Sequence, residues 1–256
     1  MEFDPKEGES KYAELDSFAD IRFHELSKLL HSFVAMSNRY GRLLCRITWI
    51  LGHTPPQTSE DSAVRDLIAD VFDFLYHSRR TTLSGALGIA YPLLRRAFES
   101  LSLMVLFMLE PEMAKKWASG KEIPNSEVRK RLGNNPMGEV EESLKELYKF
   151  FSTTTHPNRN GVPSRYLGEG NTFVLGSIGQ PDLVLVLDFC IKYLDLWYWF
   201  AAAVANNYRE LLSRTDRGLL KEYFEIQKEF ANAKQWLIEN YNRLLSDKNS
   251  TTLIPT

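Results

Sequence analysis

Residues 84–109 read SGALGIAYPLLRRAFESLSLMVLFML. This stretch predicts one strongly apolar helix, and among its three charged residues Arg95 and Glu99 have opposite signs. Because they are four positions apart, they lie on the same face of a helix and can reach each other. A charge in apolar surroundings is costly unless it is paired and hydrogen-bonded. We therefore expect an Arg95–Glu99 ion pair with either a structural or a chemical role.

The small and polar residues of this helix form one stripe, because they follow each other at steps of four and three. The simplest interpretation is a buried ion pair that fixes how neighbouring helices pack. The alternative is a binding or catalytic site polarised by an arginine and a carboxylate. Arg96 lies beside the stripe and could take the place of Arg95. The stripe consists of Ser84, Gly88, Tyr91, Arg95, Glu99 and Ser102.

Most of the chain has an apolar residue every three to four positions, which predicts helices. A long first helix is expected over residues 12–51, and Thr58 with Asp61 forms a capping signal for the next one. With 256 residues, 44% of them hydrophobic, the chain can bury a large core. We expect an all-α fold, an antiparallel helical bundle of about seven helices in a single domain over residues 1–256. The ends, 1–11 and 247–256, are expected to be frayed tails.

Residues 156–180 interrupt the helical pattern with several glycines and two prolines. Segments 165–167 and 172–175 are separated by Gly-Glu-Gly-Asn and could pair with each other. We expect one long loop or small hairpin insertion here, supported by the surrounding helices. A loop of this length inside a compact fold is often functional.

The charge balance argues against a general attraction to nucleic acid. The chain has 31 Lys and Arg against 33 Asp and Glu, a net charge of −2, so it has no overall basic field. Local groups of basic residues keep an RNA contact as a weaker alternative. These groups are Arg39, Arg42 and Arg46, and His77, Arg79 and Arg80.

The sequence favours a cytoplasmic protein without a membrane segment. Its first residues are polar and acidic, unlike a secretory signal. Residues 184–205 are long enough to span a bilayer, but Asp188, Lys192 and Asp195 share one face of that helix, which is typical of a central bundle helix. Cys45 and Cys190 lie in apolar helical stretches, so we expect two buried thiols.

No motif for a cofactor or a metal stands out. The glycines near Gly168 lack the lysine of a phosphate-binding loop, and no nucleophile elbow occurs. Two Asp/His pairs have the four-residue spacing of helical metal ligands, but His-Glu-x-x-His is absent. We therefore expect neither a cofactor nor a metal site.

His156 ends a polar run, Ser152-Thr153-Thr154-Thr155-His156, at the end of a predicted helix. The last carbonyl groups of a helix attract a cationic imidazole, so a helix cap is the simpler interpretation. The alternative is a general acid or base that acts with Arg95 and Glu99.

The pattern Leu94-Arg95-Arg96-Ala97-Phe98-Glu99, together with Trp117 and the run from Tyr148 and Ser152 to His156-Pro157, resembles a group of bacterial all-helical proteins. That group is similar to the HEPN superfamily, the helical domains of many toxin, phage-defence and RNA-cleaving systems. The resemblance covers about residues 75–157. It implies a protein that associates with itself or with a protein partner in a defence or toxin–antitoxin context.

HEPN ribonucleases typically use an arginine and a nearby histidine on a late helix. Here only Arg46 and His53 have the required spacing, and they lie early in the chain. The leading hypothesis is therefore a non-catalytic HEPN-like protein that forms a homodimer or binds a protein. The alternative is a metal-independent phosphodiesterase that cleaves RNA or nucleotides, with Arg95 holding phosphate and Glu99 and His156 as acid and base.

A seam for self-association is offered by four consecutive aromatic residues, although burial in the core is the favoured interpretation. They are Trp197, Tyr198, Trp199 and Phe200.

Overall fold

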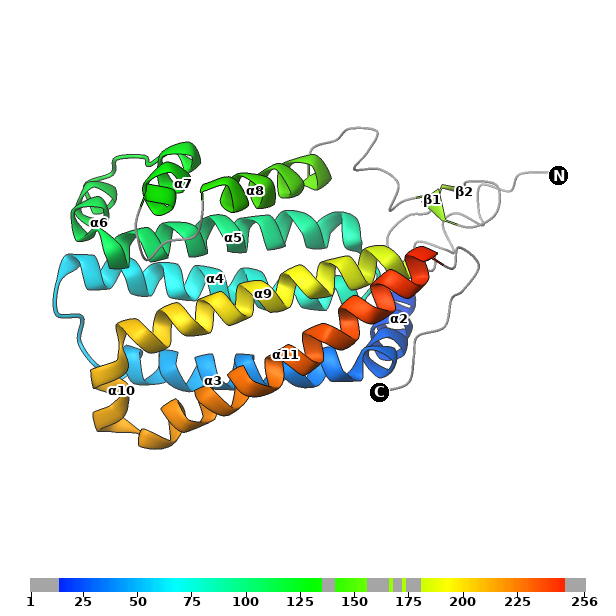
Figure 1. The fold of residues 1–256 in the computed structure, drawn as a ribbon, viewed down its shortest axis with the longest axis horizontal. Coiled ribbons are helices and arrows are strands. Elements are labelled where there is room, and N and C mark those ends of the chain that lie inside the picture. The colour runs from blue at the N-terminus through cyan, green and yellow to red at the C-terminus, as the bar shows by residue number, and fades with distance from the viewer. Residues whose placement is uncertain (1–13, 135–140, 156–165, 168–171, 174–180, 247–256) are drawn as a thin grey trace.

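The computed structural model describes residues 14–134, 141–155, 166–167, 172–173 and 181–246. This part of the chain forms an all-helical bundle (Figure 1). The predicted tails, 1–11 and 247–256, lie outside it. The helices are α2 (Leu15–Leu29), α3 (His31–His53), α4 (Ser59–Leu83), α5 (Leu87–Leu109), α6 (Pro111–Ala118), α7 (Asn125–Asn134), α8 (Glu141–Thr155), α9 (Leu183–Asn207), α10 (Arg209–Thr215) and α11 (Arg217–Ser246).

Two short strands lie within the predicted insertion, β1 (Tyr166–Leu167) and β2 (Thr172–Phe173). They pair antiparallel, with Tyr166 opposite Phe173 and Leu167 opposite Thr172. The predicted strand pairing is therefore present. The rest of the segment 156–180 lies outside the described residues.

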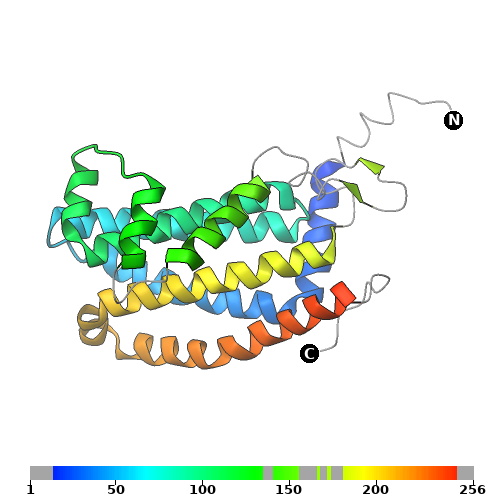
Figure 2. The same ribbon diagram turned by 45° about the horizontal axis from the view of Figure 1, so that its top comes forward.

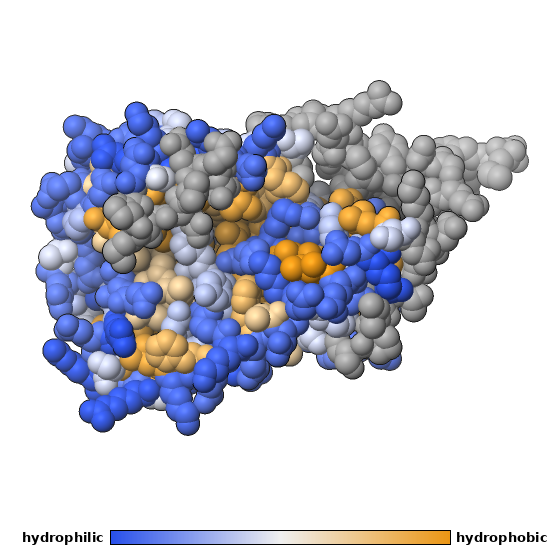
Figure 3. Space-filling model, viewed as in Figure 1, coloured by the Kyte–Doolittle hydropathy of each residue, from blue (hydrophilic) through white to orange (hydrophobic). Residues whose placement is uncertain are grey.

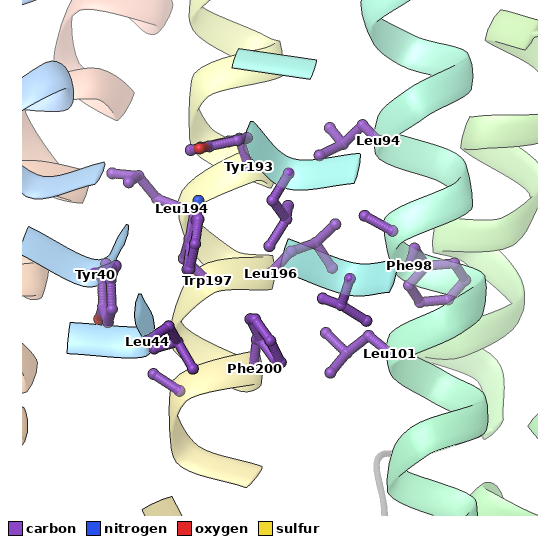
Figure 4. Close-up of a cluster of buried hydrophobic side chains, with 14 of the residues drawn as sticks. Tyr40, Leu44, Leu94, Phe98, Leu101, Tyr193, Leu194, Leu196, Trp197 and Phe200 are labelled. Atoms are coloured by element: carbon purple, nitrogen blue, oxygen red, sulfur yellow. The ribbon is translucent and has the colours of Figure 1, made fainter. Parts of the chain in front are cut away.

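Helix α9 occupies the centre of the bundle. Side chains of α3, such as Tyr40, and of α5, such as Phe98, converge on it from opposite sides (Figure 4). Trp197 is 2% exposed, and its indole stacks on Tyr40 with ring centroids 6.1 Å apart. Phe200 is fully buried next to it. The apolar character of α9 is thus explained by burial against several helices at once.

Helices α3 and α4 run antiparallel behind α9 and α11 (Figures 1 and 2). Arg65, early in α4, donates to the carbonyl oxygen of Leu51, late in α3, at 2.6 Å. Arg79, late in α4, donates to the hydroxyl of Ser37, early in α3, at 2.8 Å. The two contacts fix the relative height of the two helices at both ends.

The first helix differs from its prediction, because the chain breaks at Leu30 into α2 and α3. Leu30 has φ −105° and ψ 36°, although neither glycine nor proline stands there. Leu30 is fully buried and Leu26 nearly so. The break lets both leucines reach the core, so tertiary packing outweighs the local helical pattern.

The helix predicted to begin near residue 84 begins at Leu87 instead. Gly85 has φ 85°, and the amide groups of Gly85 and Ala86 donate to the carbonyl oxygens of Thr82 and Thr81. This is a Schellman motif, which ends α4 and reverses the chain. A further unpredicted break separates α9 from α10 at Tyr208, whose hydroxyl donates to Asp61 at 2.6 Å. The described residues therefore contain ten helices, and not about seven.

The predicted cap of α4 is confirmed. The Thr58 hydroxyl accepts a hydrogen bond from the amide of Asp61 at 3.2 Å. The Asp61 carboxylate in turn accepts from the amide of Gln57 at 3.1 Å. Two amide groups that the helix itself cannot satisfy thus find acceptors.

None of the helices within the described residues has the length and hydropathy needed to cross a bilayer. The face seen in Figure 1 is mostly hydrophilic at its edges, and apolar colour gathers along α9 between α8 and α11 (Figure 3). Charged residues interrupt α9 there, and each finds an opposite charge: Lys192 pairs with Asp188, and Asp195 pairs with Lys234 of α11. The three charged residues that share one face of this helix are therefore all paired.

Replacing Gly85 by alanine should lower the free energy of unfolding by about 1–2 kcal/mol, because a Cβ is strained at positive φ. Gly41 is the matched control, since it lies inside α3 and a Cβ there would meet nothing within 4 Å. Gly41→Ala should raise the free energy of unfolding by about 0.5–1 kcal/mol. Urea denaturation measures both. A shift of the same sign in the two variants would contradict the assignment of the turn.

Candidate functional site

The predicted ion pair on α5 is present. Arg95 Nε donates to Glu99 Oε1 at 2.9 Å. The side chain of Arg95 is 20% exposed and that of Glu99 is 12% exposed. The pair is therefore largely withdrawn from water, where each charge depends on its partner. Local helix geometry alone produces this contact, which is why the sequence could predict it.

Helix α8 contributes an aromatic partner to the pair. Arg95 Nη2 donates to the hydroxyl of Tyr148 at 3.0 Å, and the guanidinium carbon lies 5.0 Å from the centre of the Tyr148 ring. On the same side of α8, Phe151 packs on Phe98 of α5 with ring centroids 5.5 Å apart. Two contacts thus join α5 to α8, the hydrogen bond from Arg95 to Tyr148 and the packing of Phe98 on Phe151.

Two further arginines surround this group. The Arg129 guanidinium of α7 lies 3.9 Å from the centre of the Tyr148 ring, which is a cation–π distance. Arg96 Nη1 is 3.8 Å from Glu99 Oε2 and its side chain is 59% exposed. Two guanidinium groups therefore lie at the Glu99 carboxylate, and a third lies on the ring of Tyr148. We call Arg95, Arg96, Glu99, Arg129 and Tyr148 the arginine cluster.

Sequence reasoning missed Arg129 and gave Tyr148 no role beyond the resemblance. Each contact joins two different helices, so the residue spacing within one helix does not predict it. Tyr148 does stand three positions before Phe151, on the apolar side of its helix. That position indicated a residue facing the core, but not the arginine it meets.

A second polar group lies one turn earlier on α5. The Tyr91 hydroxyl donates to Asp188 Oδ2 of α9 at 2.9 Å, with the carbonyl oxygen of Leu185 3.1 Å away. Burial, with the adjacent Asp188 carboxylate, raises the pKa of Tyr91 well above its ordinary value, so the hydroxyl stays protonated and donates. Lys192 neutralises Asp188 and lies 4.1 Å from the centre of the Phe150 ring. This group joins α5 to α9 as the first joins α5 to α8.

The predicted stripe on α5 is thus partly realised. Tyr91, Arg95 and Glu99 all bond on this side, and Ser102 is buried with its hydroxyl on the Phe98 carbonyl oxygen. Ser84 belongs to the turn before the helix. His156 lies outside the described residues, so its proposed meeting with Arg95 and Glu99 stays a prediction.

The Arg46 and His53 side chains do not meet as a catalytic pair in the structure. Arg46 pairs with Asp216 at 2.7 Å and with Glu222. His53 Nδ1 bonds the carbonyl oxygen of Trp49 at 2.8 Å, within its own helix. The arginine is thus held toward α11 and the histidine ring is held against α3.

Three of the six basic residues proposed for RNA have partners within the fold. On α3, Arg39 pairs with Glu229 and Arg46 pairs with Asp216 and Glu222. On α4, Arg79 donates to Ser37 and Asn38. Arg42, His77 and Arg80 form no ion pair among the described residues, so an RNA contact stays a prediction.

The predicted burial of the two cysteines and of the aromatic run is confirmed only in part. Cys190 is buried as predicted, but Cys45 is exposed, because it lies on the outward side of α3. Trp197 and Phe200 are buried, which confirms the core interpretation for these two. Tyr198 is 43% exposed and packs on Phe230 with ring centroids 4.7 Å apart.

In the part of the chain that the structure describes, no three His, Cys, Asp or Glu side chains gather as metal ligands would.

Comparison with known proteins adds no relative. No protein-family model, no curated protein and no solved structure matches the chain.

A double-mutant cycle should measure a coupling of about 1–2 kcal/mol between Arg95→Met and Glu99→Gln in unfolding experiments, because the pair is largely buried. The matched control is Arg131–Glu127, which has the same atoms, the same 2.9 Å distance and four-residue spacing but side chains 37% and 41% exposed. Its coupling should be about 0.3–0.5 kcal/mol. Equal couplings would show that burial contributes nothing to the α5 pair.

Proposed function

We propose that this protein is a non-catalytic, HEPN-like helical protein that acts by associating with itself or with a protein partner. One observation carries the proposal: Trp49 on α3 is 70% exposed, the most exposed of the large apolar side chains in the described residues. Tryptophan is enriched at the energetic centres of protein interfaces. Its ring packs on His53 of the same helix, with ring centroids 4.4 Å apart, and on no other aromatic ring among the described residues.

The state of Arg95 and Glu99 supports a non-catalytic role. An arginine that holds phosphate needs donors directed at the substrate. Two nitrogens of Arg95 donate instead to Glu99 and Tyr148, which are side chains of the protein itself. Glu99 accepts from Arg95 of its own helix, and Arg95 in turn joins α5 to Tyr148 of α8. The defence or toxin–antitoxin context and the cytoplasmic location rest on the sequence alone.

Sedimentation velocity of the full chain over a range of concentrations tests association. The sedimentation coefficient should rise with concentration toward that of a dimer. A chain that stays monomeric up to about 100 μM would overturn self-association, because weak interfaces have dissociation constants in this range.

RNA incubation tests the absence of catalysis. We expect no cleavage by the wild-type protein and none by Glu99→Gln. Cleavage that Glu99→Gln abolishes, while the exposed control Glu127→Gln retains it, would overturn the non-catalytic interpretation and support an acid–base role of Glu99.

A second candidate function is favoured by the arginine cluster. It contains three guanidinium groups and one carboxylate, and Arg129 Nη1 is buried without a hydrogen-bond acceptor among the described residues. A phosphate group would supply that acceptor. This corresponds to the phosphodiesterase hypothesis, in which Arg95 holds phosphate and Glu99 and His156 act as acid and base.

Arg129→Gln tests this candidate. If the cluster binds phosphate, the variant should weaken the binding of a short RNA oligonucleotide about tenfold, since a hydrogen bond to a charged group is lost. Lys130→Gln is the matched control, an exposed cation at the next position of α7. Fluorescence anisotropy measures both. Equal effects of the two variants, or the absence of binding by the wild-type protein, would exclude the candidate.

A further inference from the structure

The outward sides of α3 and α4 form one surface that combines an exposed tryptophan with charges of opposite sign. We call it the α3/α4 face. On α3 it presents Arg42 and Trp49, seven residues apart, and on α4 it presents Asp66 and Asp73, also seven residues apart. Residues seven apart lie on the same side of a helix. All four side chains are exposed.

The charges of this face have no ion pairs within the described part of the chain. The two neighbours of Arg42 along α3, Arg39 and Arg46, both reach carboxylates of α11. Arg42 is exposed and forms no such contact, and Asp66 and Asp73 of α4 likewise have none among the described residues. The face thus presents a positive helix beside a negative one.

The heights of these groups along the bundle follow from two contacts already described. Arg65 meets Leu51 near one end of the helix pair, and Arg79 meets Ser37 near the other. Between these points, Arg42 lies at about the height of Asp73, and Trp49 lies at about the height of Asp66. A partner whose α4 lay across α3 at the same height would therefore bring opposite charges together.

We propose that the α3/α4 face binds the same face of a second copy of this chain, with the two-fold axis parallel to the helices. This inference rests on the proposed function, and it names the partner and the surface. The axis places α3 of each copy on α4 of the other. Arg42 then meets Asp73 of the partner subunit, and Trp49 covers Ala69 of the partner subunit, beside Asp66 of the partner subunit.

The charge pattern selects this arrangement over the other two-fold arrangement. An axis perpendicular to the helices would place α3 on α3 and α4 on α4. This axis reverses the heights along the helices, so the aspartates of one α4 would face aspartates of the other α4, and like charges across an interface disfavour association. Only the parallel axis makes the face complementary to itself, as a closed dimer requires.

The dimensions of the face suit a stable dimer. Helices α3 and α4 have 23 and 25 residues, which at 1.5 Å per residue makes each about 35 Å long. Two helices side by side, each about 10 Å wide, have an area of at most about 700 Å², because α2 also packs on α3 and α4. A standard interface buries about 800 Å² per partner. Tyr76 of α4, which is 41% exposed, adds aromatic area at the edge of the face.

Charge reversal at Arg42 and Asp73 tests the proposal. In sedimentation equilibrium, Arg42→Asp and Asp73→Arg should each raise the dimer dissociation constant about tenfold or more, because each places like charges in contact. The double variant should return to within about threefold of wild type, since the pair is restored with its signs exchanged. Arg209→Asp, a charge reversal at an exposed position on α10, should leave the constant unchanged.

Trp49→Ala should weaken the dimer about thirtyfold or more, as the loss of a central tryptophan does. Phe224→Ala is the matched control, because Phe224 is 52% exposed on α11, outside the face. Thermal unfolding of each variant checks that the fold is retained, and all substituted side chains are exposed.

The outcomes separate this inference from the proposed function. A wild-type protein that is monomeric would overturn both. A wild-type dimer that the charge reversals and Trp49→Ala leave unchanged would overturn the α3/α4 face alone, while self-association through another surface would stand. Single reversals that weaken the dimer without rescue in the double variant would overturn the Arg42–Asp73 contact and with it the parallel axis.

Discussion

The burial of α9 is the constraint on which the rest of the structure depends. This helix is apolar on nearly every side, so it needs neighbours on every side. Tyr40 of α3, Phe72 of α4 and Phe98 of α5 pack on its aromatic side chains, and Phe230 of α11 packs on Tyr198. Each surrounding helix therefore packs one of its sides against α9. Its other side is left for ion pairs, for the smaller helices or for a partner.

The charges near α9 and on α5 show how such a core tolerates polar groups. Asp188 lies on a buried helix, and both Tyr91 and Lys192 contact its carboxylate. Arg95 and Glu99 satisfy each other, and Tyr148 accepts a second hydrogen bond from the arginine. A hydrophobic pair could hold α5 against α8 equally well in energy, but it would accept several registers. The directional bonds fix one arrangement of α5 relative to α8 and α9.

The sequence predicted those features that depend on near neighbours. Apolar periodicity located the helices, four-residue spacing predicted the Arg95–Glu99 pair, and Thr58 with Asp61 predicted the cap of α4. The sequence-based predictions were wrong where contacts between residues far apart in the sequence determine the structure. The break at Leu30 follows from burial of the leucine side chains. The break between the end of α9 and the start of α10 lies at Tyr208, whose hydroxyl bonds Asp61 across the bundle. Partners such as Tyr148 for Arg95, or Glu229 for Arg39, are set by the fold and not by spacing.

Although the net charge of the chain is near zero, its charged residues differ in whether they have partners within the bundle. On α3, the arginines beside α11 are matched by carboxylates, so their charge serves the bundle. Arg42, Asp66 and Asp73 do not serve it, because exposed charges without partners add little stability to a folded chain. The exposed ring of Trp49 leaves apolar surface in contact with water, and this exposure contributes nothing to the stability of a monomer. Packing among the described residues therefore does not account for the outer sides of α3 and α4. A surface that is costly for the monomer and complementary to itself is what the proposed dimer would cover.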